Sequence, residues 1–81
     1  MEYIQFSDEF SIVETPVPDE WIGKDLIELN VRNKFGVNVI AVRSSNGKMN
    51  ISPSPKQPFS EGDSITVIGT NKSIDKLIKK E

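Results

Sequence analysis

The side chains that could do chemistry in this chain are limited by two absences. Its 81 residues include no histidine and no cysteine, which excludes Ser-His-Asp and Cys-His triads and zinc sites built on imidazole or thiolate. Carboxylates stand as adjacent pairs in expected turns, Asp8-Glu9 and Asp19-Glu20, where such pairs usually increase solubility rather than catalyse. The glycines are isolated and form no phosphate-binding loop. The sequence therefore predicts a binding or regulatory module, with no enzymatic activity and no cofactor.

Basic side chains, in contrast, are concentrated in one acid-free part of the chain, residues 30–60. They are Arg32, Lys34, Arg43, Lys48 and Lys56. This block predicts either a surface for a small anionic ligand or an ordinary solvated face. The formal net charge of −2 and a pI near 5.1 argue against a nucleic-acid polymer as a partner.

Length and composition indicate one small globular domain. Hydrophobic residues make up 36% and charged residues 27% of the chain, as in soluble domains. The chain has no apolar run of the roughly 20 residues that span a bilayer and no signal peptide in its first residues, so the expected location is the cytoplasm. Because so short a chain has no disulfide to stabilise it, association as a homodimer is one expected source of stability.

The elements that must position these groups follow the order strand, helix, three strands, helix. Strands are expected at residues 10–18, 37–43, 48–52 and 64–69, and helices at residues 24–34 and 70–80. Asn46-Gly47 predicts the turn of a hairpin, and prolines stiffen the loop 53–58. The predicted fold is α+β, a small and mostly antiparallel sheet with one helix after the first strand and a C-terminal helix. We expect a linker at residues 1–8 and the domain at residues 9–81.

The first expected helix carries two apolar stripes. They are Ile22, Leu26 and Leu29, and Ile27, Val31 and Phe35. One stripe covers the core of a small domain. The second stripe therefore predicts contact with a partner subunit or a ligand, or else burial on two sides within the domain. The strand at 37–43 is apolar on both faces apart from Asn38, so we expect both faces to be covered.

Five segments of the chain together resemble a known domain family. In chain order they are FSIVE (10–14), WIGKDLIEL (21–29), FGVNVIAVR (35–43), ISPSP (51–55) and EGDSITVIG (61–69). Their order and spacing are similar to those of the TrkA-C (RCK-C) domain over residues 9–80. Within this family the chain resembles the gating subunits of Ktr-type potassium uptake systems, the KtrA/KtrC group. The resemblance implies a TrkA-C-like fold and a cytoplasmic regulatory domain, peripheral to the cell membrane, rather than an enzyme.

The resemblance also implies a ligand and partners. Domains of this group are similar to receptors for cyclic di-AMP, which binds across a two-fold dimer interface and reduces potassium uptake. The implied partners are a second copy through the face of helix 25–35, a membrane potassium-translocating subunit reached through a gating ring, and an N-terminal Rossmann nucleotide-binding domain that is missing from this chain. The alternative is a purely structural dimerisation module of a potassium channel, a transporter or a cation–proton antiporter regulatory ring.

Carried over position by position, the resemblance implies a ligand site on the helix, the next strand and the proline loop. Its residues are Leu26, Ile27, Val31, Arg32, Asn38, and one of Pro53 and Pro55. An apolar Ile27, where many relatives carry a charge, favours the ligand-binding subgroup. Ile27 and Val31 could hold an adenine face or pack a dimer without ligand. Arg32 could bind a phosphate or pair with Glu28. Asn38 could donate to the ligand or serve as a turn residue.

Overall fold

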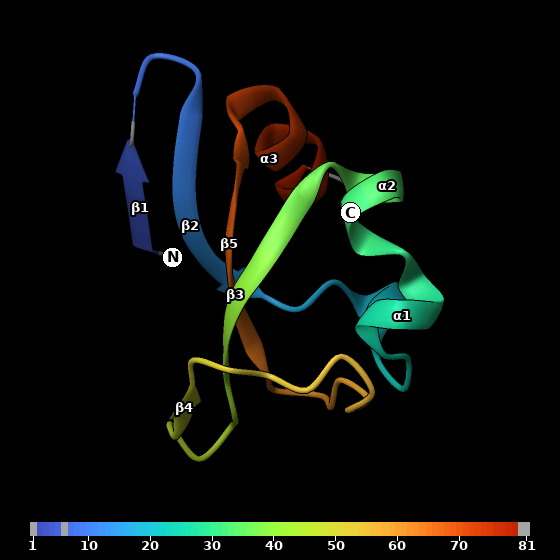
Figure 1. The fold of residues 1–81 in the computed structure, drawn as a ribbon. Coiled ribbons are helices and arrows are strands. Elements are labelled where there is room, and N and C mark those ends of the chain that lie inside the picture. Colours follow the sequence, from blue (N-terminus) through green and yellow to red (C-terminus); the bar gives the residue numbers. More distant parts are fainter. Residues whose placement is uncertain (1, 6, 80–81) are drawn as a thin grey trace.

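A five-stranded sheet forms the body of the part of the chain that the computed structural model describes, residues 2–5 and 7–79. Its strands lie in the order β1-β2-β5-β3-β4, and each strand runs antiparallel to its neighbours. Their bounds are β1 Glu2–Gln5, β2 Phe10–Pro16, β5 Ser64–Thr70, β3 Val37–Arg43 and β4 Met49–Asn50 (Figure 1). The predicted α+β class with a mostly antiparallel sheet is confirmed.

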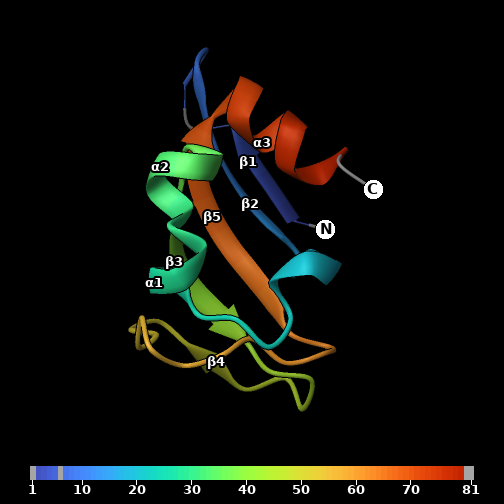
Figure 2. The same ribbon diagram turned by 90° about the vertical axis from the view of Figure 1, so that its right-hand side faces the viewer.

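The helices α1, α2 and α3 lie on one side of this sheet (Figure 2). A 3₁₀ turn η1 (Asp19–Trp21) precedes α1 (Leu26–Leu29), α2 (Val31–Phe35) and α3 (Asn71–Ile78). The hydroxyl of Thr70 accepts a hydrogen bond from the backbone N–H of Ser73, and this cap begins α3 close to the start that the sequence predicts at residue 70. Within residues 2–5 and 7–79, no helix combines the length and the apolar character that crossing a membrane requires.

The expected hairpin turn at Asn46-Gly47 and the turn before β5 are both held by local hydrogen bonds. At the hairpin between β3 and β4, the backbone N–H of Ser44 donates to the carbonyl of Lys48 at 2.9 Å. In the turn before β5, the carboxylate of Asp63 accepts a hydrogen bond from the backbone N–H of Ser60 at 2.9 Å. Such local bonds satisfy backbone groups that no strand partner can reach.

The expected linker at residues 1–8 needs a correction, because residues 2–5 form the edge strand β1. β1 pairs with β2, and Ile4 lies opposite Ile12. The turn between the two strands is held by Ser7, whose hydroxyl oxygen accepts from the backbone N–H groups of Glu9 and Phe10. Met1 and Phe6 of this segment, and residues 80 and 81 at the other end, lie outside the described residues. The domain limit at residue 9 stays a prediction.

The expected continuous helix at 24–34 is also wrong, because α1 and α2 are separated at Asn30. Asn30 has a φ of 52°, a left-handed conformation that asparagine adopts more readily than most side chains. Its backbone N–H still donates to the carbonyls of Leu26 and Ile27, so it closes α1 while the chain turns. The expected start is confirmed, because Asp25 and Glu28 form a reciprocal capping box.

The core lies between the sheet and the helices. Its most buried members are Val13, Trp21, Val37, Ile65, Val67 and Ile74. The Trp21 ring packs edge-to-face against Phe35 and at a tilt against Phe59, with centroids 5.1 and 5.6 Å apart. Because Val31 is 5% exposed and Phe35 packs on Trp21, most of the second apolar stripe belongs to this core. Only Ile27 of that stripe is exposed to solvent.

The expectation that both faces of β3 are covered is confirmed only in part. Val37 is buried on the face under the helices, and Ala41, which lies opposite Thr66 on the other face, is buried too, whereas Asn38 and Ile40 are exposed. The pairing of β3 with β5 shifts register between Val39 and Ala41, which leaves Ile40 as an extra residue that no β5 residue opposes. Ile40 keeps 41% of its surface exposed in the described chain.

Candidate functional site

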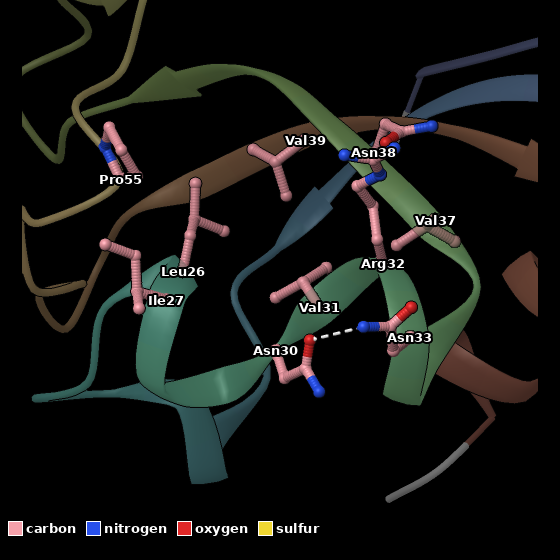
Figure 3. Close-up of a pocket in the computed structure, with 10 residues that line it drawn as sticks. All are labelled: Leu26, Ile27, Asn30, Val31, Arg32, Asn33, Val37, Asn38, Val39 and Pro55. Carbon is pink, nitrogen blue, oxygen red and sulfur yellow. Dashed lines mark hydrogen bonds between the residues drawn. The ribbon is translucent and has the colours of Figure 1, made fainter.

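A cavity of about 640 Å³ lies between α1, α2 and β3. We call it the α2–β3 pocket. Of the residues predicted to form a ligand site, those that line it are Leu26, Ile27, Val31, Arg32, Asn38 and Pro55 (Figure 3). Pro53 does not line this pocket but faces a second, smaller cavity. Of the two prolines that the sequence could not separate, Pro55 is therefore the one at the α2–β3 pocket.

The proline loop reaches the pocket through backbone hydrogen bonds to the start of α1. The N–H of Ile27 donates to the carbonyl of Pro55 at 3.4 Å, and the N–H of Phe59 donates to the carbonyl of Lys24 at 3.0 Å. The buried Phe59 ring anchors this loop in the core. These contacts explain how residues nearly thirty positions apart in sequence come to share one cavity.

The pocket has an apolar end and a polar end (Figure 3). Leu26, Ile27 and Pro55 gather at the apolar end. At the polar end, the Arg32 side chain extends from α2 toward β3, in the direction of Asn38. Both of these polar residues are exposed to solvent.

Arg32 is available to a ligand because its expected intrahelical partner is engaged elsewhere. The Glu28 carboxylate accepts a hydrogen bond from the backbone N–H of Asp25 in the capping box at 3.1 Å. Among residues 2–5 and 7–79, the ion pair recorded joins Glu14 and Arg43, and none joins Arg32 to Glu28. The residues that line the pocket include no carboxylate, so no negative charge in the lining would repel an anion bound near Arg32.

Two polar residues of the pocket, Asn30 and Asn33, were missed by the sequence reasoning. The side-chain amide of Asn33 donates to the side-chain oxygen of Asn30 at 2.9 Å (Figure 3). Both looked like ordinary polar positions of a continuous helix. Asparagine next to an apolar helix stripe was the available signal for a left-handed break that turns α2 toward β3.

The arrangement is suited to binding rather than to catalysis. A cation at one end and apolar side chains at the other fit a ligand that joins an anionic group to a flat apolar ring. The lining contains no carboxylate, lysine, serine or tyrosine that could act as a base or nucleophile. Within the described residues, no group of three or more carboxylates is placed to hold a metal ion.

Comparison with known proteins gives this pocket a family context. The model of the TrkA-C domain matches residues 10–80. In Bacillus subtilis (strain 168), Ktr system potassium uptake protein A is 36% identical over 77 residues, which cover 95% of this chain and 34% of that protein. Ktr system potassium uptake protein C of the same organism is 28% identical over 80 residues, covering 99% of this chain and 36% of the relative. The chain thus spans about a third of the length of these curated relatives.

Solved structures agree with this assignment. The RCK C domain of the potassium transport protein KtrA, in complex with cyclic di-AMP, superposes with a TM-score of 0.80 at 31% identity, over 91% of this chain and 86% of that one. The RCK_C domain dimer of S. agalactiae BusR, also in complex with cyclic di-AMP, gives a TM-score of 0.71 at 30% identity, over 85% of this chain and 91% of that one. From the matched family model, the sequence relatives and this shared fold, we conclude that the chain belongs to the TrkA-C domain family.

Proposed function

We propose that this chain is a ligand-sensing regulatory domain that binds cyclic di-AMP in the α2–β3 pocket. The observation that carries the proposal is the pairing of an apolar end with Arg32 and Asn38 in one cavity. Support comes from the two similar domains, of KtrA and BusR, whose structures were solved in complex with this dinucleotide. Regulation of this kind requires binding and involves no chemistry on the ligand.

Each part of the ligand has a suitable group in the pocket. An adenine ring would lie against Leu26, Ile27 and Val31, where contact with apolar side chains replaces contact with water. The Arg32 guanidinium would donate to a phosphate in a charge-assisted, bidentate geometry. The Asn38 amide would donate a further hydrogen bond. Pro55 would close the apolar end.

A homodimer completes the site in this proposal. Cyclic di-AMP has two equal halves, and a two-fold interface offers each half the same residues from each subunit. Ile27 is an apolar side chain that remains 58% exposed in the single chain, at the mouth of the pocket. A second copy and the ligand would both cover it. The similar BusR domain was solved as a dimer.

The biological role follows from the relatives as a proposal. Those relatives are potassium uptake proteins about three times as long as this chain. Within such a protein, on the cytoplasmic side of the membrane, the domain would follow a Rossmann nucleotide-binding domain and act on a membrane potassium-translocating subunit. Cyclic di-AMP would reduce uptake by binding more tightly to the low-transport state, because a ligand shifts an equilibrium only by its differential affinity.

Calorimetric titration of the purified chain with cyclic di-AMP tests the proposal, with cyclic di-GMP and ATP as competitor nucleotides. We expect selective binding of one ligand per two chains. Arg32→Ala should abolish it, whereas Lys34→Ala, a neighbouring cation of α2 that does not line this pocket, should bind as the parent does. Equal loss in both variants, or none in either, would contradict the assignment of Arg32.

The alternative is a purely structural dimerisation module, and the exposed Ile27 favours it independently of any ligand. Light scattering together with the titration distinguishes the two functions. A dimer that binds none of the three nucleotides supports the structural module. A dimer that binds cyclic di-AMP supports the sensor.

A further inference from the structure

A second cavity of about 280 Å³ lies on the other side of the proline loop. We call it the loop cavity. Its apolar floor is formed by Leu26, Val42 and Phe59, and Phe59 is 4% exposed and held by Trp21 beneath it. The proposed function makes no use of this cavity, apart from Leu26, which lines both.

The walls of the loop cavity are polar but carry no cation. Its polar side chains are Ser44, Asn50, Ser54, Gln57, Ser60 and Asp63. An anionic ligand would therefore find no opposite charge, in contrast to the α2–β3 pocket with its Arg32. The loop cavity contains one carboxylate, that of Asp63, which would repel an anion.

Local hydrogen bonds orient these walls and leave groups for a ligand. Asp63 accepts from the backbone N–H of Ser60 through one carboxylate oxygen, Oδ2. Asn50 accepts from the backbone N–H of Ser52 through its side-chain oxygen. The second oxygen of Asp63 and the amide N–H₂ of Asn50 therefore remain as an acceptor and a donor on side chains that are already fixed.

We propose that the loop cavity is a binding site for a small, neutral, polyhydroxylated molecule of about the size of a pentose. Hydroxyl groups would donate to Asp63 and exchange hydrogen bonds with Asn50 and Gln57, and the C–H face of the molecule would rest on the apolar floor. The volume is just below the range of about 300–1,000 Å³ that holds drug-sized ligands. It therefore suits a molecule of about ten heavy atoms.

The position of this site relative to the α2–β3 pocket gives it a consequence. Pro53 and Ser54 face the loop cavity, whereas Pro55 faces the other pocket. One short stretch of loop, together with Leu26, thus forms the wall between them. A ligand that fixes this wall would change the affinity of the neighbouring pocket, and the effect would be reciprocal.

The test is a titration of the ¹⁵N-labelled chain with D-ribose, followed by NMR and run without any nucleotide. We expect saturable shifts of the amides of Ser44, Asn50, Gln57 and Ser60, with a Kd of roughly 1–10 mM, as a ligand of about ten heavy atoms allows. Inorganic phosphate, added separately, should not shift these amides. Unsaturable shifts scattered over the surface, or shifts with phosphate and not with ribose, would overturn the proposal.

Matched variants localise the binding. Gln57→Ala removes an exposed wall residue and should weaken ribose binding about threefold or more. Gln5→Ala should leave it unchanged, because Gln5 belongs to β1, at the opposite edge of the sheet from β4 and its cavity residue Asn50. Arg32→Ala should also bind ribose normally, so failure of the dinucleotide site and failure of this site are distinguishable. Equal ribose affinity in Gln57→Ala and the parent would place the binding elsewhere and overturn the assignment.

Discussion

Arg43 of β3 and Glu14 of β2 form an ion pair across β5, the strand that separates them. The Nε of Arg43 donates to one carboxylate oxygen of Glu14 at 2.7 Å, and a terminal nitrogen of Arg43 donates to the other at 3.3 Å. Thr66 of β5 lies opposite Glu14 in the register, on the strand between β2 and β3. The Glu14 side chain is 17% exposed. The pair therefore ties together three strands of the sheet on the face that the helices leave bare.

This ion pair makes the stability of the fold depend on pH. The hydrogen bond from Arg43 holds the pKa of Glu14 below its usual 4.5. The stabilisation is fully present above about pH 4.5 and is lost as the pH falls through the lowered pKa of the folded state. We expect Glu14→Gln to lower the free energy of unfolding at pH 7 by about 0.5–1 kcal/mol, and to have a smaller effect at pH 3.

Urea unfolding followed by the fluorescence of Trp21, the chain's one tryptophan, measures this difference. Glu61→Gln serves as the control, because Glu61 is an exposed glutamate of the turn before β5. The same loss for Glu14→Gln at pH 7 and pH 3 would show that the charge of Glu14 is not what stabilises the sheet.

Much of the fold could be predicted because local patterns decide it. The runs of apolar and β-branched residues at 10–18 and 64–69 correctly predicted the strands β2 and β5, although in β2 it is Ser11 and Val13 that are buried while Phe10 is 41% exposed. The capping residues Asp25 and Thr70 began helices where predicted. The pair of Arg43 and Glu14 could not be predicted, because it depends on the register of two strands against a third that comes later in the chain.

The pocket was only partly predictable for a related reason. Leu26 and Arg32 could be predicted as site residues because they lie close together in the sequence, in a stretch that resembles the family. The choice between Pro53 and Pro55 depended on the path of a loop, and one backbone hydrogen bond from Ile27 brings Pro55 to the pocket. Asn33 was missed because the apolar residues keep a helical spacing through Asn30. The periodicity therefore gave no sign of the turn there that brings α2 and Asn33 to the pocket.

Substitution of Asn30 tests whether the helix break depends on a left-handed residue. Asn30→Gly should change the free energy of unfolding by a few tenths of a kcal/mol, because glycine adopts positive φ without strain. Asn30→Ala should cost about 1 kcal/mol more. Both variants lose the side-chain bond to Asn33, so their difference isolates the backbone conformation. Equal urea midpoints for the two variants would contradict this account.

The proposed dimer interface is best tested at Ile27, and not at Val31. Ile27 is 58% exposed, so Ile27→Asp should leave the free energy of unfolding within about 0.5 kcal/mol. It should raise the dimer dissociation constant at least about tenfold in sedimentation equilibrium, because it brings a charge into the interface. Val31 is 5% exposed, and Val31→Asp should unfold the chain, so loss of its dimer would be uninformative.

A matched control for Ile27→Asp is Ile51→Asp. Ile51 is an isoleucine of the segment after β4 that is 77% exposed and does not line the α2–β3 pocket. We expect Ile51→Asp to dimerise as the parent does. If both variants dissociate to the same degree, the interface is not specific to the helix face of residues 25–35.

The end of α2 depends on Gly36, and a double-mutant cycle with Ser73 of α3 separates its two roles. Gly36 has a φ of 72°, and a Cβ added there would lie 2.6 Å from the Ser73 hydroxyl oxygen. Gly36→Ala should therefore cost about 1–2 kcal/mol from backbone strain and a further amount from this overlap. In a Ser73→Ala background the overlap disappears and only the strain should remain. An identical cost of Gly36→Ala in both backgrounds, measured by urea unfolding, would mean that the Ser73 side chain rotates away freely and that α2 and α3 are not tightly packed at this point.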